Sequence, residues 1–544
     1  FRKEMCIRDR FRIEIGEIQS RILNYSNIKD CFVTVLNIKN TKVLCAYYVC
    51  EKTIDVKNLR HYLQKVLPMY MVPKYYVNLK EIPLTVNGKV NKNLLPSPSL
   101  SKHKAIVKPK NDMENILHDI FCDLLQVNEL SVTSNFFEHY VDSLTIIKAQ
   151  TKLYSMGYNI NTQDFYEYPT IRKLSLHILR KSNNKTHLCS ENIPVISEIA
   201  KPIERNYTFN NILLYGVTGF LGAHIFHELI LKTNSQIYCI IREKNNLNAI
   251  QRFYEKFSFY FPSENIEDYK NRIHLITGNI LKENFNLSSK QYDFLGKSID
   301  CVINSAALVK HYGKYEEFYN TNVDGTKKIT DFCIKYNIPL HYVSTLSVSG
   351  YGLTKSPDAV FTEKDFYVGQ NYEDNVYVKS KFEGEKLILN ACKNSNLCAT
   401  IYRVGNITNR FSDGAFQQNA GENAFLNRIS AVINLHCMPK ELLNFPIEFT
   451  PVDYCANFIV ELLTKDFRQN NLTVYHLFNQ NYLDFNYLFN FLKYLNINID
   501  LCNITDFEKR ILDSKDNYFG IINYLANIKN ISADSPHNYF NGIS

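Results

Sequence analysis

The stretch Asn211-Ile-Leu-Leu-Tyr-Gly-Val-Thr-Gly-Phe-Leu-Gly-Ala-His-Ile225 decides the fold of the larger part of this chain. Its first five residues predict a buried strand, and a helical pattern continues to Lys232. Between them, Gly216, Gly219 and Gly222 form a G-x-x-G-x-x-G turn. Such a turn lets the backbone approach a pyrophosphate, whose charge is stabilised at the helix N-terminus. Taken alone, the glycines are a modest signal, and the alternative is a simple tight turn.

Strands and helices alternate around this turn. Apolar runs predict strands at residues 210–215, 236–241, 272–276, 299–304, 339–344 and 398–403, with helical segments between them. This alternation predicts a Rossmann-type, doubly wound parallel sheet with its ligand at the carboxyl ends of the strands. We expect this domain to occupy residues 205–544, with a smaller substrate lobe after Arg403.

Arginines follow the second predicted strand. That strand ends at Arg242, and Arg252 lies further along the same segment. A site for NAD usually has an acidic residue here to bind the ribose 2′-hydroxyl, whereas arginine suits a 2′-phosphate. Glu243 is displaced from that position by one residue. We therefore expect NADPH; the alternative is that both arginines lie on a solvated helix face.

The segment Tyr377-Val-Lys-Ser-Lys381 supplies candidate catalytic groups. Residues four apart share a helix face, so an ammonium at Lys381 is expected to lower the Tyr377 pKa and make the phenol a usable proton donor. In a chain with 37 Tyr a lone Y-x-x-x-K pattern is weak. Here it follows the glycine turn, Arg242 and a predicted strand ending at Thr345, in the order that a nicotinamide-dependent enzyme requires.

Composition limits the remaining possibilities. The 544 residues predict more than one domain. A net charge of +8 is spread over 62 basic and 54 acidic residues without a basic block, so we expect neither nucleic acid nor a membrane as partner. The 14 Cys form no C-x-x-C pair, which predicts no zinc site and reduced thiols in the cytoplasm. No apolar run reaches the ~18–20 residues of a membrane span, and no signal peptide is visible.

The first part of the chain, residues 1–100, predicts a small α+β subdomain. Alternating apolar residues predict strands at 31–36 and 43–49, and a helix is expected over 56–66. Asn87-Gly88 is a turn signal that presents Lys89 at its edge. From these residues alone, Lys89 is an ordinary lysine on a surface hairpin.

A second segment, residues 106–182, predicts a helical bundle. It follows a Pro/Ser-rich linker, and a helix is expected over 112–125. Ser143 lies next to the start of another predicted helix. A phosphodiester on this serine would gain from the exposed N–H groups of the helix start, although an N-capping serine gives the same spacing.

Motifs in the first segment resemble the C-terminal subdomain of adenylation domains from nonribosomal peptide synthetases. They are FRIEIGEI (11–18) and LPMYMVP…PLTVNGKVNKNLL (67–95). The resemblance implies that Lys89 is the adenylation lysine, which reaches carboxylate and phosphate oxygens. The large N-terminal part of such a domain is missing from the sequence, so we expect no adenylation by this segment alone. Residues 5–10 depart from the family pattern, which has a glycine before FRIE.

The second segment resembles a peptidyl carrier protein. The matching motifs are NFFEHYVDSL (135–144) and FYEYPTI (165–171). This resemblance implies that Ser143 carries covalent 4′-phosphopantetheine, attached by a phosphopantetheinyl transferase. Tyr140 and Val141 stand where the family usually has two glycines.

The third segment resembles the extended short-chain dehydrogenase/reductases, and more closely the terminal thioester reductase domains of nonribosomal peptide synthetases. The matching motifs are GVTGFLG, YCIIRE, NSAA, NVDGT, VSTLSV, YVKSK, YRVGN and TPVD. Asn279 stands where the family usually has Asp. The resemblance implies Thr345, Tyr377 and Lys381 as catalytic residues. The implied cofactor-binding residues are Gly216, Thr218, Gly219, Phe220, Leu221, Gly222, Arg242, Arg252, Asn279, Ile280, Ser305, Ala306, Ala307, Asn322, Tyr377 and Lys381.

Together these resemblances imply a terminal module that receives a peptidyl or aminoacyl thioester from upstream synthetase modules. NADPH-dependent reduction would release the product as an aldehyde, and a second reduction would give an alcohol. An aminoadipate-reductase or carboxylic-acid-reductase type of enzyme has the same parts and a free acid as substrate. A nucleotide-sugar epimerase or dehydratase and a non-catalytic carrier scaffold are the remaining alternatives.

Overall fold

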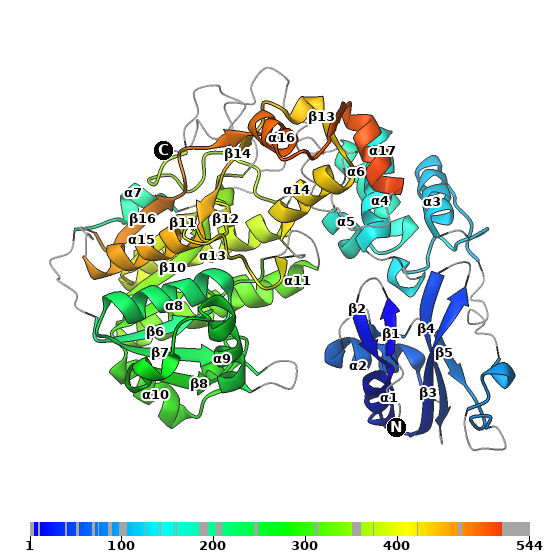
Figure 1. The fold of residues 1–544 in the computed structure, drawn as a ribbon, viewed down its shortest axis with the longest axis horizontal. Coiled ribbons are helices and arrows are strands. Elements are labelled where there is room, and N and C mark those ends of the chain that lie inside the picture. Colours follow the sequence, from blue (N-terminus) through cyan, green and yellow to red (C-terminus); the bar gives the residue numbers. More distant parts are fainter. Residues whose placement is uncertain are drawn as a thin grey trace. The chain divides into compact units, whose positions relative to one another are not determined.

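In the computed structural model the chain divides into two compact units, Phe1–Val107 and Lys108–Ser544 (Figure 1). Each unit is described by itself. The structure describes residues 5–8, 11–38, 41–50, 54–67, 71–73, 75–84, 90–96, 106–125, 127–139, 141, 143–156, 158, 160, 162–183, 194–202, 209–243, 248–309, 314–350, 361–373, 375–420, 423–465 and 470–513. Among these residues, no helix combines the length and the apolar character that crossing a membrane requires.

The first unit is a small α+β fold, as predicted. Its elements are β1 (Met5–Arg8), β2 (Phe11–Glu14), α1 (Ile15–Leu23), β3 (Ile28–Ile38), β4 (Thr41–Cys50), α2 (Val56–Val66), β5 (Tyr75–Asn78) and η2 (Lys92–Leu94). Strand β4 pairs antiparallel with β3 and parallel with β5, which the sequence did not predict. Helices α1 and α2 bury Ile18 and Leu59 against this sheet, because their apolar residues recur at helical spacing.

Lys89 lies outside the described residues. On either side of the segment that contains it, Leu84 and Val90 form an antiparallel bridge. Pairing at this point is what a hairpin around the predicted Asn87-Gly88 turn requires. The role of Lys89 stays a prediction.

The second unit starts with the helical segment predicted from the sequence. Its elements are α3 (Asp112–Leu125), η3 (Phe136–His139), α4 (Ser143–Ser155), α5 (Thr162–Glu167) and α6 (Ile171–Asn183). Phe121, Phe136 and Phe165 are buried and their rings pack together. Arg172 of α6 donates to the buried Glu114 of α3 at 3.0 Å, which joins the last helix to the first.

The rest of the second unit is built on a seven-stranded parallel sheet of order β16-β11-β10-β9-β6-β7-β8. Six of its strands are those predicted from the sequence, and β16 is additional. The strands are β6 (Asn211–Tyr215), β7 (Gln236–Ile241), β8 (Ile273–Thr277), β9 (Cys301–Asn304), β10 (Leu340–Thr345), β11 (Ala399–Val404) and β16 (Leu472–Leu477). The chain runs outward from β6 through β7 to β8 and returns to the other side of β6 at β9. The carboxyl ends of β6 and β9 therefore form the switch point where such folds bind ligands.

Alternate residues of each strand face opposite layers of helices. Leu213 and Tyr215 of β6 belong to the core under α10, α12 and α13, whereas Ile212 and Leu214 belong to the core under α8, α9 and α15. These layers flank the sheet in Figure 1. The helices on and beside the sheet are α7 (Ile196–Ile199), α8 (Phe220–Lys232), α9 (Ala249–Tyr260), η4 (Ile266–Arg272), η5 (Glu283–Asn286), α10 (Ser289–Ser298), α11 (Tyr315–Phe318), η6 (Tyr319–Asp324), α12 (Gly325–Tyr336), η7 (Leu346–Ser349), α13 (Val376–Ser395) and α15 (Val452–Thr464).

A smaller lobe with its own apolar core follows β11. Its elements are β12 (Ile407–Thr408), α14 (Ala424–Asn434), β13 (Cys437–Pro439), η10 (Lys440–Leu442), β14 (Pro446–Ile447), β15 (Thr450–Pro451), β17 (Leu483–Asp484), α16 (Phe485–Tyr494), β18 (Asp500–Cys502) and α17 (Ile504–Asp513). Met438, Leu442 and Phe507 lie at the centre of this core. Its position after β11 agrees with the expected substrate lobe.

The segment before β6 packs on the same sheet. Ile196 and Ile199 of α7 are buried in the core beneath α13. The backbone of Lys201 exchanges two hydrogen bonds with Asn471, which lies just before the edge strand β16. These contacts attach residues 194–202 to the edge of the sheet.

Candidate functional site

The glycine turn lies between the switch-point strands. Gly216 follows β6 with a φ of +90°, and a Cβ built there would lie 2.6 Å from the backbone of Ser305, which follows β9. A Cβ on Gly222 would lie only 2.1 Å from the Gly216 carbonyl oxygen. Gly219 is the N-cap of α8, and as a glycine it has no side chain to bond the first N–H groups of the helix. The turn is therefore a cradle that fits a pyrophosphate at a helix N-terminus.

Replacing Gly222 with Ala is expected to weaken NADPH binding about tenfold or more, because the new Cβ forces the turn apart at a typical overpacking cost of about 1–3 kcal/mol. Titrating NADPH fluorescence against the variant measures this loss. Gly16→Ala is the matched control, since a Cβ there meets nothing within 4 Å. Unchanged affinity in Gly222→Ala would show that cofactor does not use this turn.

The remaining predicted residues of the turn contribute to its walls. Phe220 and Leu221 are the first residues of α8. The Phe220 ring packs against Tyr260 and Phe416, so this side chain supports the turn from behind. Thr218 lies inside the turn, and its hydroxyl accepts a hydrogen bond from Arg252.

Arg242 and Arg252 meet at the carboxyl end of β7. One guanidinium nitrogen of Arg252 donates to the Arg242 carbonyl, and another donates to the Thr218 hydroxyl at 3.4 Å. Burial, followed by the charge of Arg242, lowers the pKa of Arg252. Like charges held together in this way favour an anionic ligand. Glu243 is exposed beside them.

Asn279 and Ile280 follow β8, as predicted. The Asn279 side-chain oxygen accepts from the Leu281 backbone N–H at 3.0 Å, and the backbone N–H of Asn279 donates to the Phe285 carbonyl at 2.7 Å. Asn279 thus fixes a turn at the carboxyl end of β8, where the resemblance implies cofactor binding. The Ile280 side chain packs over Gly325.

The segment Ser305-Ala306-Ala307 follows β9 next to the glycine turn. Ser305 donates to the Tyr215 carbonyl at 3.0 Å, and Ala306 donates to the buried Asn304 side chain at 3.1 Å. These bonds hold the small residues against β6 and leave little side chain above the switch point. The arrangement is compatible with the cofactor-binding role that the resemblance implies for these residues.

Thr345 and Tyr377 meet at the carboxyl end of the sheet. Thr345 is the last residue of β10 and is 6% exposed, and Tyr377 is the second residue of α13. The Thr345 hydroxyl hydrogen-bonds the Tyr377 phenol. The structure therefore brings together two of the three predicted catalytic side chains.

Hydrogen bonds fix the first turn of α13. The Asn375 side chain caps the helix by accepting from the backbones of Tyr377 at 2.9 Å and Val378 at 3.2 Å. The Ser380 hydroxyl donates to the Tyr377 carbonyl at 2.8 Å and accepts from the Asn322 amide at 2.9 Å. These contacts determine where the Tyr377 backbone lies. An asparagine just before a helical run is a capping signal, so the role of Asn375 was predictable from the sequence.

Asn322 joins three parts of the site. It lies in η6, a π-helical turn between α11 and α12. Its side chain exchanges two hydrogen bonds with the backbone of Leu308, at 2.7 and 3.1 Å, as well as reaching Ser380. π-Helical turns are frequent at functional sites because they re-aim a side chain. Asn322 was predicted to bind cofactor, and here it positions the backbone around that site.

Lys381, the third predicted catalytic residue, is buried. Only 2% of it is exposed, its Nζ donates to the Val343 carbonyl at 2.7 Å, and the ammonium lies 4.1 Å from the centre of the Tyr342 ring. Burial lowers the pKa of Lys381 to about 7, and the negative charge of Glu385 opposes this change. The lysine is therefore poised near neutrality between its charged and neutral forms.

The expectation that Lys381 lowers the Tyr377 pKa is wrong for this structure. Burial raises the pKa of Tyr377 to about 12, and only the hydrogen bond from Thr345 acts in the opposite direction. Desolvation outweighs the neighbouring lysine because Lys381 directs its ammonium to Val343 and Tyr342. Tyr377 accordingly keeps its proton across the neutral range, in the form that can donate it.

In the helical segment, Ser143 is the first residue of α4. The helix therefore starts at the residue predicted to carry phosphopantetheine, and the N-terminus of a helix favours the negative charge of a phosphodiester. No metal site was predicted. In the described parts of the chain, His, Cys, Asp and Glu do not gather in groups of three or more that could hold an ion.

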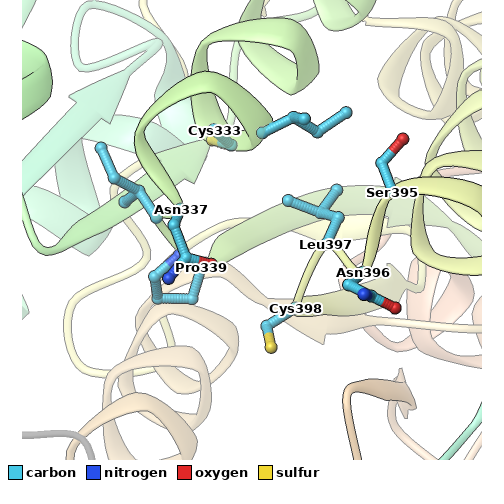
Figure 2. A pocket seen from close by; sticks show the side chains of 9 residues that line it. Cys333, Asn337, Pro339, Ser395, Asn396, Leu397 and Cys398 are labelled. Carbon is cyan, nitrogen blue, oxygen red and sulfur yellow. The ribbon is translucent and has the colours of Figure 1, made fainter.

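A small hollow lies at the amino ends of β10 and β11, the opposite end of the sheet from the candidate site (Figure 2). Its walls include Cys333, Asn337 and Pro339 from the connection before β10, and Asn396 and Cys398 from the connection before β11. Its volume of about 20 Å³ suits a water molecule rather than a substrate. At about 3.3 Å per residue, the length of β10 places it roughly 17 Å from Thr345. The hollow is therefore separate from the candidate site.

Comparison with protein families assigns all three segments. The model described as "Male sterility protein", an NAD-binding family, matches residues 214–459. The model "Phosphopantetheine attachment site" matches residues 115–178, and "AMP-binding enzyme C-terminal domain" matches residues 17–89. The chain thus contains an NAD(P)-binding domain, a phosphopantetheine attachment domain and the C-terminal domain of an AMP-binding enzyme.

Two solved structures and one curated protein are similar to much of the chain. A thiolation-reductase di-domain from an archaeal nonribosomal peptide synthetase is 30% identical with a TM-score of 0.63, covering 78% of this chain and 91% of that one. The terminal R domain of the myxalamid PKS-NRPS pathway is 27% identical with a TM-score of 0.51, covering 61% and 82%. A linear gramicidin synthase from Brevibacillus parabrevis is 28% identical over 496 residues, which are 87% of this chain and 10% of that protein. The chain therefore spans about a tenth of that curated relative.

Proposed function

Because the chain belongs to the thiolation–reductase family of nonribosomal peptide synthetases, we propose that it reductively releases a thioester carried on its own phosphopantetheine. The acyl or peptidyl group is held on Ser143, NADPH is the reductant and an aldehyde is the product. The observation that carries the proposal is the hydrogen-bonded Thr345–Tyr377 pair beside the switch point, in the same chain as a phosphopantetheine attachment domain. A tethered arm has no use in a nucleotide-sugar epimerase, and a mere scaffold does not need this pair.

Arg242 and Arg252 support the choice of NADPH over NADH. Both lie at the end of β7, where the 2′-position of an adenosine ribose is bound in this fold, and their charges suit a phosphate. The glycine turn fits the pyrophosphate, because the turn packs so tightly against its own backbone and that of Ser305 that a Cβ at Gly216 or Gly222 would force it apart. When bound, NADPH would supply hydride to the thioester carbonyl carbon.

The protein side chains then manage charge and protons. When a thioester is bound, the Thr345 hydroxyl turns its proton from the Tyr377 oxygen to the substrate carbonyl oxygen. Thr345 and Tyr377 then both donate hydrogen bonds to that oxygen as it becomes negative, which stabilises the developing charge. Tyr377 transfers its proton to that oxygen, which gives a hemithioacetal. Lys381 holds the nicotinamide ribose through the N–H groups that Val343 does not use.

Release completes the reaction. The carbon–sulfur bond of the hemithioacetal breaks, the hydroxyl oxygen forms the aldehyde carbonyl, and its proton passes to the leaving sulfur. The arm on Ser143 is left as a free thiol. One hydride and one proton are consumed for each aldehyde. A further hydride and proton would convert the aldehyde to an alcohol.

Replacing Arg252 with Ala is expected to weaken NADPH binding about 10- to 100-fold, because hydrogen bonds to charged groups contribute about 1.5–3 kcal/mol each. NADH binding, which involves no 2′-phosphate, is expected to change little. Dissociation constants for both nucleotides, measured on the variant and on the wild-type chain, give the ratio. An equal loss for the two nucleotides would contradict a 2′-phosphate site at Arg252.

The proposed reaction is tested with a free acyl-pantetheine thioester. The chain is incubated with this substrate and NADPH, the decrease in NADPH absorbance is followed, and the aldehyde is trapped with a hydrazine. Hydrazone formation in proportion to NADPH consumed is expected. NADPH binding without oxidation across several acyl groups would contradict the proposal. An alcohol in place of the hydrazone would show that a second reduction follows.

A further inference from the structure

An ion pair lies buried beside the catalytic helix. Arg403 of β11 donates to the two carboxylate oxygens of Glu385 at 2.8, 3.1 and 3.2 Å, and neither side chain is exposed. Arg403 also donates to the Asp365 carbonyl at 2.8 Å and to Nε2 of His476 on β16 at 3.3 Å, and its guanidinium lies over the Phe361 ring. Burying two charges costs several kcal/mol per ion before their attraction is counted. Because this cost offsets much of the attraction, the pair is weak evidence for stability, and a further role is considered.

Glu385 lies on the face of α13 that carries the reactive groups. Tyr377, Lys381 and Glu385 follow one another at intervals of four residues, so they lie along one side of the helix. Lys381 and Glu385 are both buried. Arg403 approaches Glu385 from the neighbouring strand. The carboxylate is therefore paired with Arg403 and lies one helical turn from Lys381, so its field acts on both cations.

Lys381 needs such a field to stay charged. Its contacts with the Val343 carbonyl and the Tyr342 ring replace only part of the hydration that an ammonium loses on burial. Burial is the largest influence on Lys381 and favours the neutral amine, and Glu385 is the charged group that opposes it. Without that carboxylate the balance would move further toward the neutral form.

Other charged groups near α13 are directed elsewhere. Lys379 lies over the Tyr315 ring, and Glu383 accepts from the same phenol, so both belong to a cluster with α11. On η6, Asp324 pairs with Lys328 of α12. On β10 the titratable neighbour of Lys381 is Tyr342, which burial keeps neutral by raising its pKa. Glu385 is thus the carboxylate on the Lys381 side of α13 in the described structure.

We propose that Glu385, held by Arg403, is a positioning residue that keeps Lys381 in its charged form for binding the cofactor ribose. The role rests on the proposed function, since it concerns the same site. Arg403 limits the effect by neutralising part of the carboxylate charge. The two members of the ion pair therefore act on Lys381 in opposite directions.

The test is the pH dependence of the reaction in variants of the pair. Activity requires charged Lys381, so the rate falls as the pH rises through the Lys381 pKa, about 7 in the wild-type chain. Glu385→Gln removes the favourable charge. It is expected to move the falling limb of the pH–rate profile to lower pH, by about 1 pH unit or more. Asp331→Asn, which disrupts an exposed ion pair with Lys327 on α12, is the control and should leave the limb in place.

Arg403→Gln is expected to move the same limb upward, because Glu385 then acts on Lys381 without a competing cation. A merely structural role would lower the rate at every pH or destabilise the fold, and would not give opposite shifts. Thermal melting identifies variants that fail to fold. For those, the double variant Glu385→Gln/Arg403→Gln is used, because its two amides can hydrogen-bond to each other. Its falling limb is expected at a lower pH than that of the wild type. The proposal would be overturned if the falling limb lay at the same pH in the two single variants, or if it shifted in the same direction in both. An unshifted falling limb in the double variant would overturn it as well.

NADPH affinity gives a second readout that does not depend on turnover. The dissociation constant, measured by fluorescence from pH 5 to 9 in steps of about half a unit around the Lys381 pKa, should increase as Lys381 loses its proton. The pH at the midpoint of this increase should shift in each variant in the same direction as the falling limb of the pH–rate profile. If no thioester is reduced but these binding midpoints shift in opposite directions, the proposed function fails and the role of Glu385 stands. If thioesters are reduced and the midpoints coincide, the role of Glu385 fails alone.

Discussion

Tyr377→Phe is expected to reduce kcat for thioester reduction by about 10²- to 10⁴-fold, the usual contribution of a positioned proton donor. The variant loses the proton that the carbonyl oxygen receives and one of the two hydrogen bonds to that oxygen. Because burial raises the Tyr377 pKa to about 12, the phenol carries its proton throughout the neutral range. The factor by which the Tyr377→Phe variant is slower than the wild type should therefore be nearly the same from pH 6 to pH 9, within about twofold.

The control for this prediction is Tyr319→Phe, a change at a tyrosine that is 44% exposed on η6. Stopped-flow measurement of NADPH oxidation at saturating thioester separates the chemical step from binding. The Tyr319 variant should react at the wild-type rate. A Tyr377→Phe enzyme that retained more than about a tenth of the wild-type rate would rule out the phenol as the proton donor.

Ser143→Ala is expected to abolish reduction of carrier-bound substrate completely, because alanine offers no hydroxyl for the phosphodiester. Reduction of a free acyl-pantetheine thioester should continue at the wild-type rate, since Ser143 belongs to the attachment domain and not to the reductase. Mass spectrometry after treatment with a phosphopantetheinyl transferase checks the first effect, and NADPH oxidation checks the second.

Ser155→Ala, at the other end of α4, is the matched control and should accept the arm normally. If the Ser143 variant gained the mass of phosphopantetheine, the attachment site would lie elsewhere. If it lost reduction of the free thioester as well, the two domains would be coupled in a way that this account does not include.

Most of the reductase sheet could be predicted from the sequence, because its inner strands are continuous apolar runs between turn signals. Strand β10, Leu340–Thr345, is buried along its whole length and was placed within one residue. Strand β16 was missed. It lies at the edge of the sheet, and its run Leu472-Thr-Val-Tyr-His-Leu477 alternates apolar and polar residues with only partial burial. A strand of that kind resembles many exposed segments.

Residues of the candidate site were predictable where chemistry dictates spacing. Thr345 and Tyr377 could be paired from their order in the chain, and the structure brings them together. The contribution of Ser380 to the first turn of α13 depends on the backbone that it binds. The π-helical turn at Asn322 has no sequence period that would distinguish it from the flanking helices.

Electrostatic properties were the least predictable. The sequence places Lys381 one turn from Tyr377, which suggested a lowered tyrosine pKa, whereas the pKa depends on how deeply both groups are buried. Glu385 and Arg403 are separated in sequence and lie on a helix and a strand, so their pairing required the fold.

Single turnover of the full chain, with an acyl-phosphopantetheine arm on Ser143, tests the central claim most directly. The loaded protein is mixed with NADPH, and NADPH oxidation, the free thiol on the arm and the released product are quantified together. The account predicts one aldehyde and one protein thiol for each NADPH consumed, or one alcohol for each two. Release of a carboxylic acid without NADPH oxidation, or an arm that stays acylated while NADPH is bound, would contradict it.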